Sequence, residues 1–114
     1  MQKVAVVCGG YSGEAEVSMR SAAMVMEHID KDLYFPVKVV IQPDRWYAEW
    51  KGTEVEVNRN DFSVMLDGQS VQFDGAFIIV HGTPGENGLL QGYFDMIGLP
   101  YTTGDVLNMA ITFN

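Results

Sequence analysis

The sequence has 114 residues, 47% of them hydrophobic, which is enough for one domain with a buried core and too short for two. Fifteen acidic residues against seven basic ones give a formal charge of -8, and this excess disfavours nucleic acid as a partner because it repels a phosphate backbone. The single cysteine excludes an internal disulfide and a cysteine-based metal site.

No apolar stretch approaches the roughly 20 residues that a membrane-spanning helix requires. The first residues, Met1 to Lys3, lead directly into a strand-like run and lack the charged, apolar and small-residue stages of a signal peptide. We therefore expect no membrane segment and a cytoplasmic location.

The first third of the chain predicts a strand, a helix and a second strand. Val4 to Cys8 is apolar on both alternating faces, which is typical of a strand covered by helices on both sides of a parallel sheet. After a glycine turn, apolar residues recur at the helical positions Ala22, Val25, Met26 and Ile29. Val37 to Ile41 then completes a predicted βαβ unit. No base lies near Cys8 in sequence, so we interpret its thiol as a small buried group and not as a nucleophile.

The segment between residues 43 and 74 predicts two inserted β-hairpins. Short alternating runs are separated by turn dipeptides, and Asp67-Gly68 readily adopts the positive φ angles of a two-residue turn. The paired runs are Trp46 to Trp50 with Thr53 to Val57, and Ser63 to Leu66 with Ser70 to Phe73. We interpret Trp46 and Trp50 as a satellite hydrophobic cluster under the hairpins, in preference to an interaction patch.

The strand and helix pattern resumes at Ala76 to Val80, which reads as a buried strand. The next helix has an apolar face made of Leu89, Leu90, Tyr93, Phe94 and Ile97, and Gly98 and Pro100 mark its end. A short strand from Leu99 to Thr102 and a helix from Asp105 follow. That helix reaches Asn114 without a cap, so we expect the natural chain to continue. The predicted fold is α/β and three-layered, with a mainly parallel, Rossmann-like sheet.

Two glycine-rich polar loops follow predicted strands, GGYSGEAEVS from Gly9 to Ser18 and HGTPGENG from His81 to Gly88. In an open α/β sheet, ligands collect at the carboxyl ends of the strands, where such loops lie. The first loop lacks the Gly-Lys-Ser/Thr ending of a P-loop and the GxGxxG spacing of a dinucleotide site, which disfavours nucleotide binding there. Its glycines are also explained as simple turn residues.

The first loop carries two acids, Glu14 and Glu16, which point in nearly opposite directions if the helix begins there. Glu14 lies nearer the turn and is the candidate to bind a cationic group such as an amino acid's ammonium. An equally good interpretation is that both acids merely complement the helix dipole.

The second loop begins with His81, which could bind a substrate carboxylate or move a proton, with Glu86 orienting its ring. The alternatives are a structural histidine at a strand end and a first-turn acid for the following helix. Backbone amides around Asn87 and Gly88 could hold an anion in either case.

Together the two loops resemble the amino-terminal domain of the D-alanine–D-alanine ligases, in the ATP-grasp superfamily. The family pattern of a strand, two glycines, a polar turn and E-x-E-V-S stands here as GGYSGEAEVS, and its HGxxGE signature with LQG, a helix and G-[IL]-P-Y stands as HGTPGENGLLQGYFDMIGLPYT. The resemblance covers about Lys3 to Ile41 and Phe77 to Phe113, and the segment between them looks like a lineage-specific elaboration. The sequence departs from the pattern at Asn87, where the family has an acid, and at NMAITFN, where it has a Met-Asp-Lys ending.

The resemblance implies ATP-driven joining of two D-alanines for peptidoglycan synthesis. In that reaction the first carboxylate becomes an acyl phosphate, which the second amino group attacks. The resemblance makes Glu14 and His81 the catalytic residues: Glu14 anchors the first ammonium, and His81 lies beside the reacting groups. The substrate-binding residues that it implies are Glu14, Val17, Ser18, His81 and Gly82, with Ser12 in the same turn.

The cofactors implied are ATP and Mg²⁺ or Mn²⁺, held by central and carboxyl-terminal domains that would begin just after Asn114. Residues 1–114 would then form one substrate-binding domain with no nucleotide or metal site. We expect this domain alone to be inactive and to bind D-alanine weakly, because an exposed carboxylate–ammonium pair contributes only about 0 to 1 kcal/mol. Analogy with the family also implies a homodimer.

Two alternatives remain open. A D-alanine–D-lactate or D-alanine–D-serine ligase would carry the same motifs, since acceptor choice depends largely on residues outside this chain. A non-catalytic flavodoxin-like binding or dimerisation module would share the architecture. A receiver domain, however, needs clustered acids at the end of its first strand, where Val7-Cys8-Gly9-Gly10 supplies none.

Overall fold

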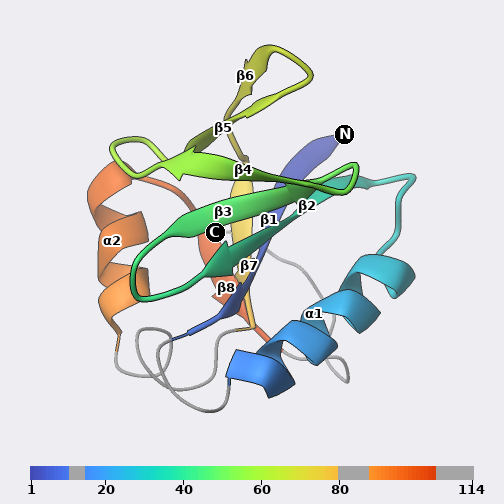
Figure 1. Ribbon diagram of the computed structural model, residues 1–114, viewed down its shortest axis with the longest axis horizontal. Coiled ribbons are helices and arrows are strands. Elements are labelled where there is room, and N and C mark those ends of the chain that lie inside the picture. Colours follow the sequence, from blue (N-terminus) through green and yellow to red (C-terminus); the bar gives the residue numbers. More distant parts are fainter. Residues whose placement is uncertain (11–14, 80–87, 105–114) are drawn as a thin grey trace.

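The computed structural model describes residues 1–10, 15–79 and 88–104. These residues form one eight-stranded mixed sheet and two α-helices (Figure 1). In chain order the elements are β1 (Gln2–Gly9), α1 (Ala15–His28), β2 (Tyr34–Ile41), β3 (Trp46–Trp50), β4 (Thr53–Asn58), β5 (Ser63–Leu66), β6 (Gln69–Val71), β7 (Gly75–Ile78), α2 (Leu89–Ile97) and β8 (Tyr101–Thr103). Neither of these two described helices is long and apolar enough to cross a membrane.

The sheet has the strand order β6-β5-β4-β3-β2-β1-β7-β8. β1 pairs in parallel with β2 and β7, and β7 pairs in parallel with β8. The other four pairings among the described strands, from β2 through to β6, are antiparallel. The prediction of a mainly parallel, Rossmann-like sheet is therefore wrong. The reason is that β3 of the first hairpin pairs with the edge of β2, and β5 of the second hairpin pairs with β4, so both hairpins extend the same sheet.

Both predicted hairpins are confirmed. β3 and β4 are joined by Lys51 and Gly52, with φ angles of 49° and 77°, and β5 and β6 by Asp67 and Gly68, with 52° and 80°. Two successive positive φ angles are typical of the tight turns that match the twist of a hairpin. The second hairpin is shorter than predicted, because β6 ends at Val71 and the chain then leaves the sheet.

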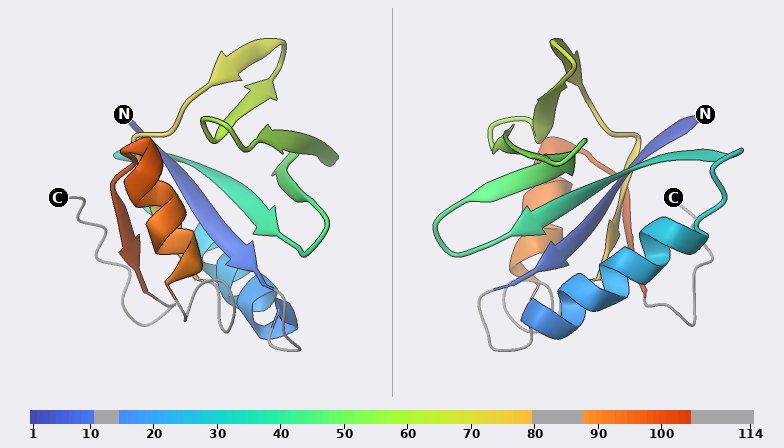
Figure 2. Two further views of the ribbon diagram at one scale, coloured as in Figure 1. Left: turned by 90° about the vertical axis from the view of Figure 1, so that its left-hand side faces the viewer. Right: turned by 45° about the vertical axis from the view of Figure 1, so that its right-hand side comes forward.

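The two helices cover opposite faces of the sheet around β1 (Figure 2). Successive side chains of a strand point to opposite faces, so β1 contributes to two separate cores. The core under α1 contains Val4, Val6, Cys8, Ala22 and Val25. The core under α2 contains Ala5, Val7, Leu90 and Phe94. The predicted apolar faces of both helices thus pack on the sheet, except that Leu89, predicted for the face of α2, is 60% exposed.

Aromatic residues of the inserted segment complete the core under α2. The ring centroid of Trp46 lies 5.0 Å from that of Tyr93, and the centroid of Phe62 lies 4.9 Å from that of Phe94, both edge to face. Trp46 therefore belongs to the main core, and the satellite cluster predicted for it is wrong, while Trp50 packs at the margin of the same core. The curl of the sheet brings β4 to β6 over the face that α2 covers (Figure 2).

The end of α2 follows the sequence prediction closely. Gly98 adopts a left-handed conformation with φ 75°, and its N–H donates to the carbonyls of Asp95 and Phe94. β8 begins at Tyr101, two residues later than predicted. Pro100 has no N–H to donate, and its carbonyl joins the sheet by accepting a hydrogen bond of 2.9 Å from the N–H of Ala76.

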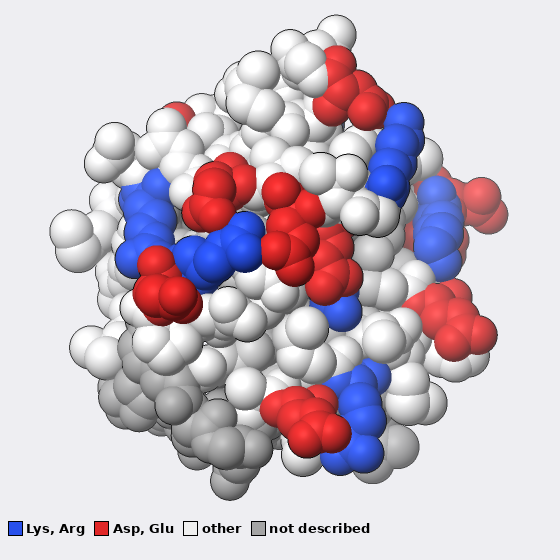
Figure 3. Space-filling model, viewed as in Figure 1, with Lys and Arg blue, Asp and Glu red and all other residues white. Residues whose placement is uncertain are grey.

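Charged side chains beside the inserted hairpins pair with one another. Arg45 contacts the carboxylates of Glu54 and Glu56 at 2.7 and 2.8 Å, and the Nζ of Lys51 lies 2.8 Å from the carboxylate of Asp67. Basic side chains lie beside acidic ones across this face of the molecule (Figure 3). Because the pairs are exposed, each contributes little to stability.

Candidate functional site

The candidate site lies at the edge of the sheet where β1 and β7 end. The two strands are parallel neighbours, with Val7 beside Ile78, so their carboxyl ends reach the same edge. The amino-terminal ends of α1 and α2 lie at this edge as well (Figures 1 and 2). Such an edge is where α/β proteins bind small ligands, and it is the place that the two predicted loops indicate.

The turn after β1 needs glycine. Gly9 and Gly10 have φ angles of 95° and 127°, in the region that disfavours other residues. A Cβ atom on Gly9 would lie 2.4 Å from the carbonyl oxygen of Ile41 in β2. The N–H of Gly10 donates to that same oxygen at 2.7 Å. The interpretation of these two as turn glycines is confirmed, and the turn is held tightly against β2.

Ser18 lies in the second turn of α1 and is fully buried. Its Oγ accepts a hydrogen bond of 3.0 Å from the N–H of Gly9 and donates one of 2.6 Å to the carbonyl oxygen of Ile79. The hydroxyl thus joins the end of β1 to the residue that follows β7. Contact of Ser18 with substrate stays a prediction, and the structure adds this bridge between strands, which sequence reasoning missed.

Val17 and Glu16 lie on the surface at the start of α1. Val17 is 46% exposed, so its side chain is available as a wall of the site. Glu16 lies in the first helical turn, where a negative charge is favourable beside the positive end of the helix dipole. This position agrees with the dipole interpretation of Glu16.

The other predicted site residues lie outside the described residues. They are Ser12, Glu14, His81, Gly82, Glu86 and Asn87, and the same holds for Gly13 and for the helix predicted from Asp105. The described chain resumes at Gly88, the amino-terminal cap of α2, with φ 83°. The first turn of α2 contains no acidic residue, which leaves the positive end of its dipole suited to an anion.

Cys8 is a buried thiol, as interpreted from the sequence. Its Sγ lies 3.5 Å from the Sδ of Met19 and 3.6 Å from the carbonyl oxygen of Val39. Burial raises the pKa of Cys8 to about 12. Since the thiolate is the reactive form, this thiol is inert at neutral pH and takes no part in the site.

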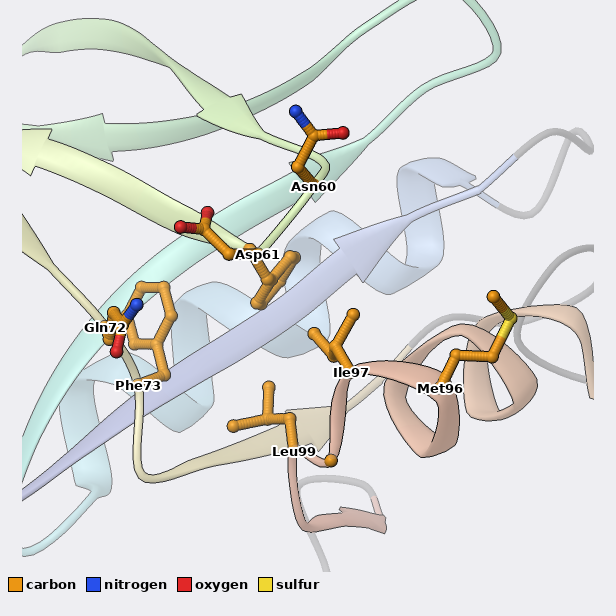
Figure 4. Close-up of a pocket in the computed structure, with 9 residues that line it drawn as sticks. Asn60, Asp61, Gln72, Phe73, Met96, Ile97 and Leu99 are labelled. Carbon is orange, nitrogen blue, oxygen red and sulfur yellow. The ribbon is translucent and has the colours of Figure 1, made fainter.

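A separate hollow of about 460 Å³ lies at the carboxyl-terminal end of α2 (Figure 4). Its lining comes from the inserted segment, including Asp61 and Gln72, and from the end of α2 and the residues after it, including Met96 and Leu99. Ser63 donates to the Asp61 carboxylate through its hydroxyl at 2.7 Å and its N–H at 3.0 Å, and these bonds lower the pKa of Asp61. No local sequence pattern marks this hollow, because its two walls are far apart in the chain.

Metal ligands are not grouped in the part of the chain that the structure describes. Among residues 1–10, 15–79 and 88–104, no three His, Cys, Asp or Glu side chains are placed to hold an ion.

Comparison with known proteins decides the family. The model of the family described as "D-ala D-ala ligase N-terminus" matches residues 3–104. The chain belongs to this family. A D-alanine–D-alanine ligase from Porphyromonas gingivalis is 52% identical over 112 residues, which cover 97% of this chain and 34% of that protein.

Solved structures of ligases share the fold. D-alanyl-alanine synthetase A from Vibrio cholerae superposes with a TM-score of 0.75 at 27% identity, covering 89% of this chain and 30% of the other. The VanG D-Ala:D-Ser ligase from Enterococcus faecalis gives a TM-score of 0.72 at 29% identity, covering 88% and 35%. The chain therefore spans about a third of the length of these relatives.

The ligase-family match also runs through the inserted hairpins. It is given for residues 3–104 as one span, and the P. gingivalis relative aligns over nearly the whole chain. The hairpin segment between residues 43 and 74 is therefore shared with that relative, and its being specific to one lineage of the family stays a prediction. The motifs did not reveal this because hairpin sequences are set by alternation and turn residues, which many sequences satisfy.

Proposed function

We propose that this chain is the substrate-binding amino-terminal domain of an ATP-dependent D-alanine–D-alanine ligase that acts in peptidoglycan synthesis in the cytoplasm. One observation carries the proposal beyond family membership. The glycine turn after β1 and the loop after β7 begin on adjacent parallel strands, whose ends Ser18 joins directly. Two loops that begin side by side can supply residues to one small site.

In this proposal Glu14 binds the ammonium of the first D-alanine. It lies five positions after Gly9 in sequence, and its carboxylate would form a charge-assisted hydrogen bond with the amine. His81 lies two positions after Ile79 and would sit beside the reacting groups. Val17 would form part of the wall, and Gly82 would allow the backbone to approach the substrate closely.

In our proposal, ATP and Mg²⁺ or Mn²⁺ bind elsewhere in the ligase and not to the residues of this chain that the structure describes. Those residues contain no cluster of carboxylates for a metal ion, and the sequence lacks a P-loop. In our proposal the rest of the ligase holds them, and it closes over the D-alanine site and excludes water. The chain alone would then have no ligase activity. Dimerisation through this domain is part of the same proposal.

A second candidate is a ligase of the same family that accepts D-serine or D-lactate in place of the second D-alanine. The observation that favours it is the likeness to VanG, which is nearly as strong as the likeness to the V. cholerae enzyme. Acceptor competition with D-alanine, D-serine and D-lactate on the full-length protein separates the candidates. Preferential use of D-serine or D-lactate would replace the main proposal.

The test of the Glu14 role is a pair of matched substitutions in the full-length ligase, Glu14→Gln and Glu16→Gln. Each removes one acid near the start of α1, but only Glu14 is proposed to touch substrate. A hydrogen bond to a charged group contributes about 1.5 to 3 kcal/mol, so we expect Glu14→Gln to lower kcat/KM for D-alanine by roughly 10-fold to 100-fold. Glu16→Gln should stay within about twofold of the wild type. Equal kinetics of the two variants would refute the proposed role.

A further inference from the structure

The Ser18 hydroxyl lies where the next backbone hydrogen bond between β1 and β7 would otherwise form. The last direct bond of this ladder runs from the N–H of Ile79 to the carbonyl of Val7, at 2.7 Å. In a parallel ladder the carbonyl of Ile79 would then accept the next bond from the N–H of Gly9. Here Gly9 donates to the Oγ of Ser18, and Ser18 donates to Ile79. One oxygen atom is therefore inserted between the two backbone groups.

The inserted oxygen acts on one side of β1 only. Pairing of β1 with β7 stops at Val7 and Ile78, whereas pairing of β1 with β2 continues to Gly9 and Ile41. A direct N–H to carbonyl bond would hold the strands about 2.9 Å apart at these atoms. With a hydroxyl between them, β1 and β7 are held apart at the edge where the two loops begin.

The position of Ser18 on α1 supports this role. Ser18, Ala22 and Val25 form the buried face of the helix, and the other two are core residues. A buried hydroxyl is unfavourable unless it is hydrogen-bonded, and this one is bonded on both sides. At a position on the buried face of α1, the serine thus forms a hydrogen-bonded bridge between two strand ends and not an apolar contact.

We propose that Ser18 is a positioning residue whose hydroxyl sets the separation between the ends of β1 and β7, and so the spacing of the loops that carry Glu14 and His81. This inference rests on the proposed function of those two residues. Ser18 would act through them and would not touch the reacting atoms itself. A misplacement of about 1 Å in such a site can reduce turnover roughly 100-fold, so a one-atom spacer is large enough to matter.

The experiment compares three variants of the full-length ligase with the wild type. Ser18→Ala removes the hydroxyl, Ser18→Thr keeps it, and Ser63→Ala removes another buried serine hydroxyl, which bonds Asp61 in the inserted segment. Two quantities are measured: steady-state kinetics for D-alanine and for ATP, and the hydrogen-exchange rate of the Gly9 amide by NMR.

We expect Ser18→Ala to expose the Gly9 amide to exchange and to lower kcat/KM for D-alanine roughly 10-fold to 100-fold, with the KM for ATP unchanged. Ser63→Ala should lose about as much thermal stability as Ser18→Ala, but it should keep the wild-type kinetics and the protection of the Gly9 amide. Ser18→Thr keeps a hydroxyl, so its kcat/KM should stay near the wild-type value if the Gly9 amide stays protected from exchange. It should fall if that protection is lost. A variant in which the two quantities do not change together would overturn the proposal.

The outcomes separate this inference from the proposed function. A wild-type ligase that does not join D-alanine would overturn the function, and the inference with it. An active wild type whose Ser18→Ala variant keeps full kcat/KM, or keeps a protected Gly9 amide, would overturn the positioning role alone.

Discussion

Replacement of Gly9 by alanine is the most direct test of the turn at the end of β1. The backbone at Gly9 has a φ of 95°, and an added Cβ would lie 2.4 Å from the carbonyl oxygen of Ile41. Two separate costs follow. One is the conformational cost of a positive φ for a residue with a Cβ, and the other is the overlap with a backbone atom, which can be relieved only by moving β1 or β2.

Gly52 supplies a matched control, because alanine at this position meets the conformational cost of a positive φ but not the overlap with a backbone atom. It has a φ of 77°, and a Cβ atom on it would meet nothing within 4 Å. Gly52→Ala should therefore lower the free energy of unfolding only by the conformational cost, about 1 to 2 kcal/mol. Gly9→Ala adds about 1 to 3 kcal/mol for the overlap, which gives a loss of roughly 2 to 5 kcal/mol. A loss of that size is a large part of the total stability of a small domain.

The assay is urea unfolding of the purified chain, followed by the fluorescence of its tryptophans, of which Trp46 is buried. Linear extrapolation gives the free energy of unfolding for each variant, and unchanged slopes show that the two states remain comparable. Equal losses for Gly9→Ala and Gly52→Ala would show that β1 and β2 do not approach as closely as the structure has them, and the reasoning would be refuted.

Two further predictions concern the two cores. Because burial raises the pKa of Cys8 from 9.0 to about 12, the unfolded chain releases this proton before the native chain does, so stability should fall between pH 9 and 12. Urea unfolding should show a smaller fall in Cys8→Ala, and equal pH dependence of the two chains would contradict the burial. Phe94→Ala removes a fully buried ring beside Phe62 and should cost about 3 to 5 kcal/mol in the same assay. Met96→Ala, at a side chain 87% exposed, should change stability by less than about 0.5 kcal/mol, and similar losses for both variants would place Phe94 outside the core.

Much of the fold could be predicted from short-range patterns, but the sheet type depends on one connection, from Gln42 to Arg45. The hairpin patterns do not show whether this connection reverses the chain. Pro43-Asp44 is a turn signal, and the structure closes there with a 2.9 Å bond from the N–H of Gln42 to the carbonyl of Arg45. This turn directs β3 back along β2, so the inserted strands join the sheet in antiparallel order.

Part of the candidate site could also be predicted from the sequence, and part of it could not. Glycine at the end of β1 was predictable, because a sharp turn after a strand needs a residue without a Cβ. The specific need for Gly9, its approach to Ile41 in β2, was not, because it joins residues far apart in the chain. The two motifs indicated the family to which the chain belongs, but the spacing of their residues does not say which of them touch substrate.

The sequence by itself determined the local elements: the continuous apolar run of β1, the apolar faces of α1 and α2, and the turn dipeptides of the hairpins. These depend on residues within a few positions of one another. Only the tertiary structure decided the balance of parallel and antiparallel pairing and the bridge of Ser18 between Gly9 and Ile79. The physical reason is that a hydrogen bond forms between whichever groups packing brings within about 3 Å, and position along the chain does not determine that distance.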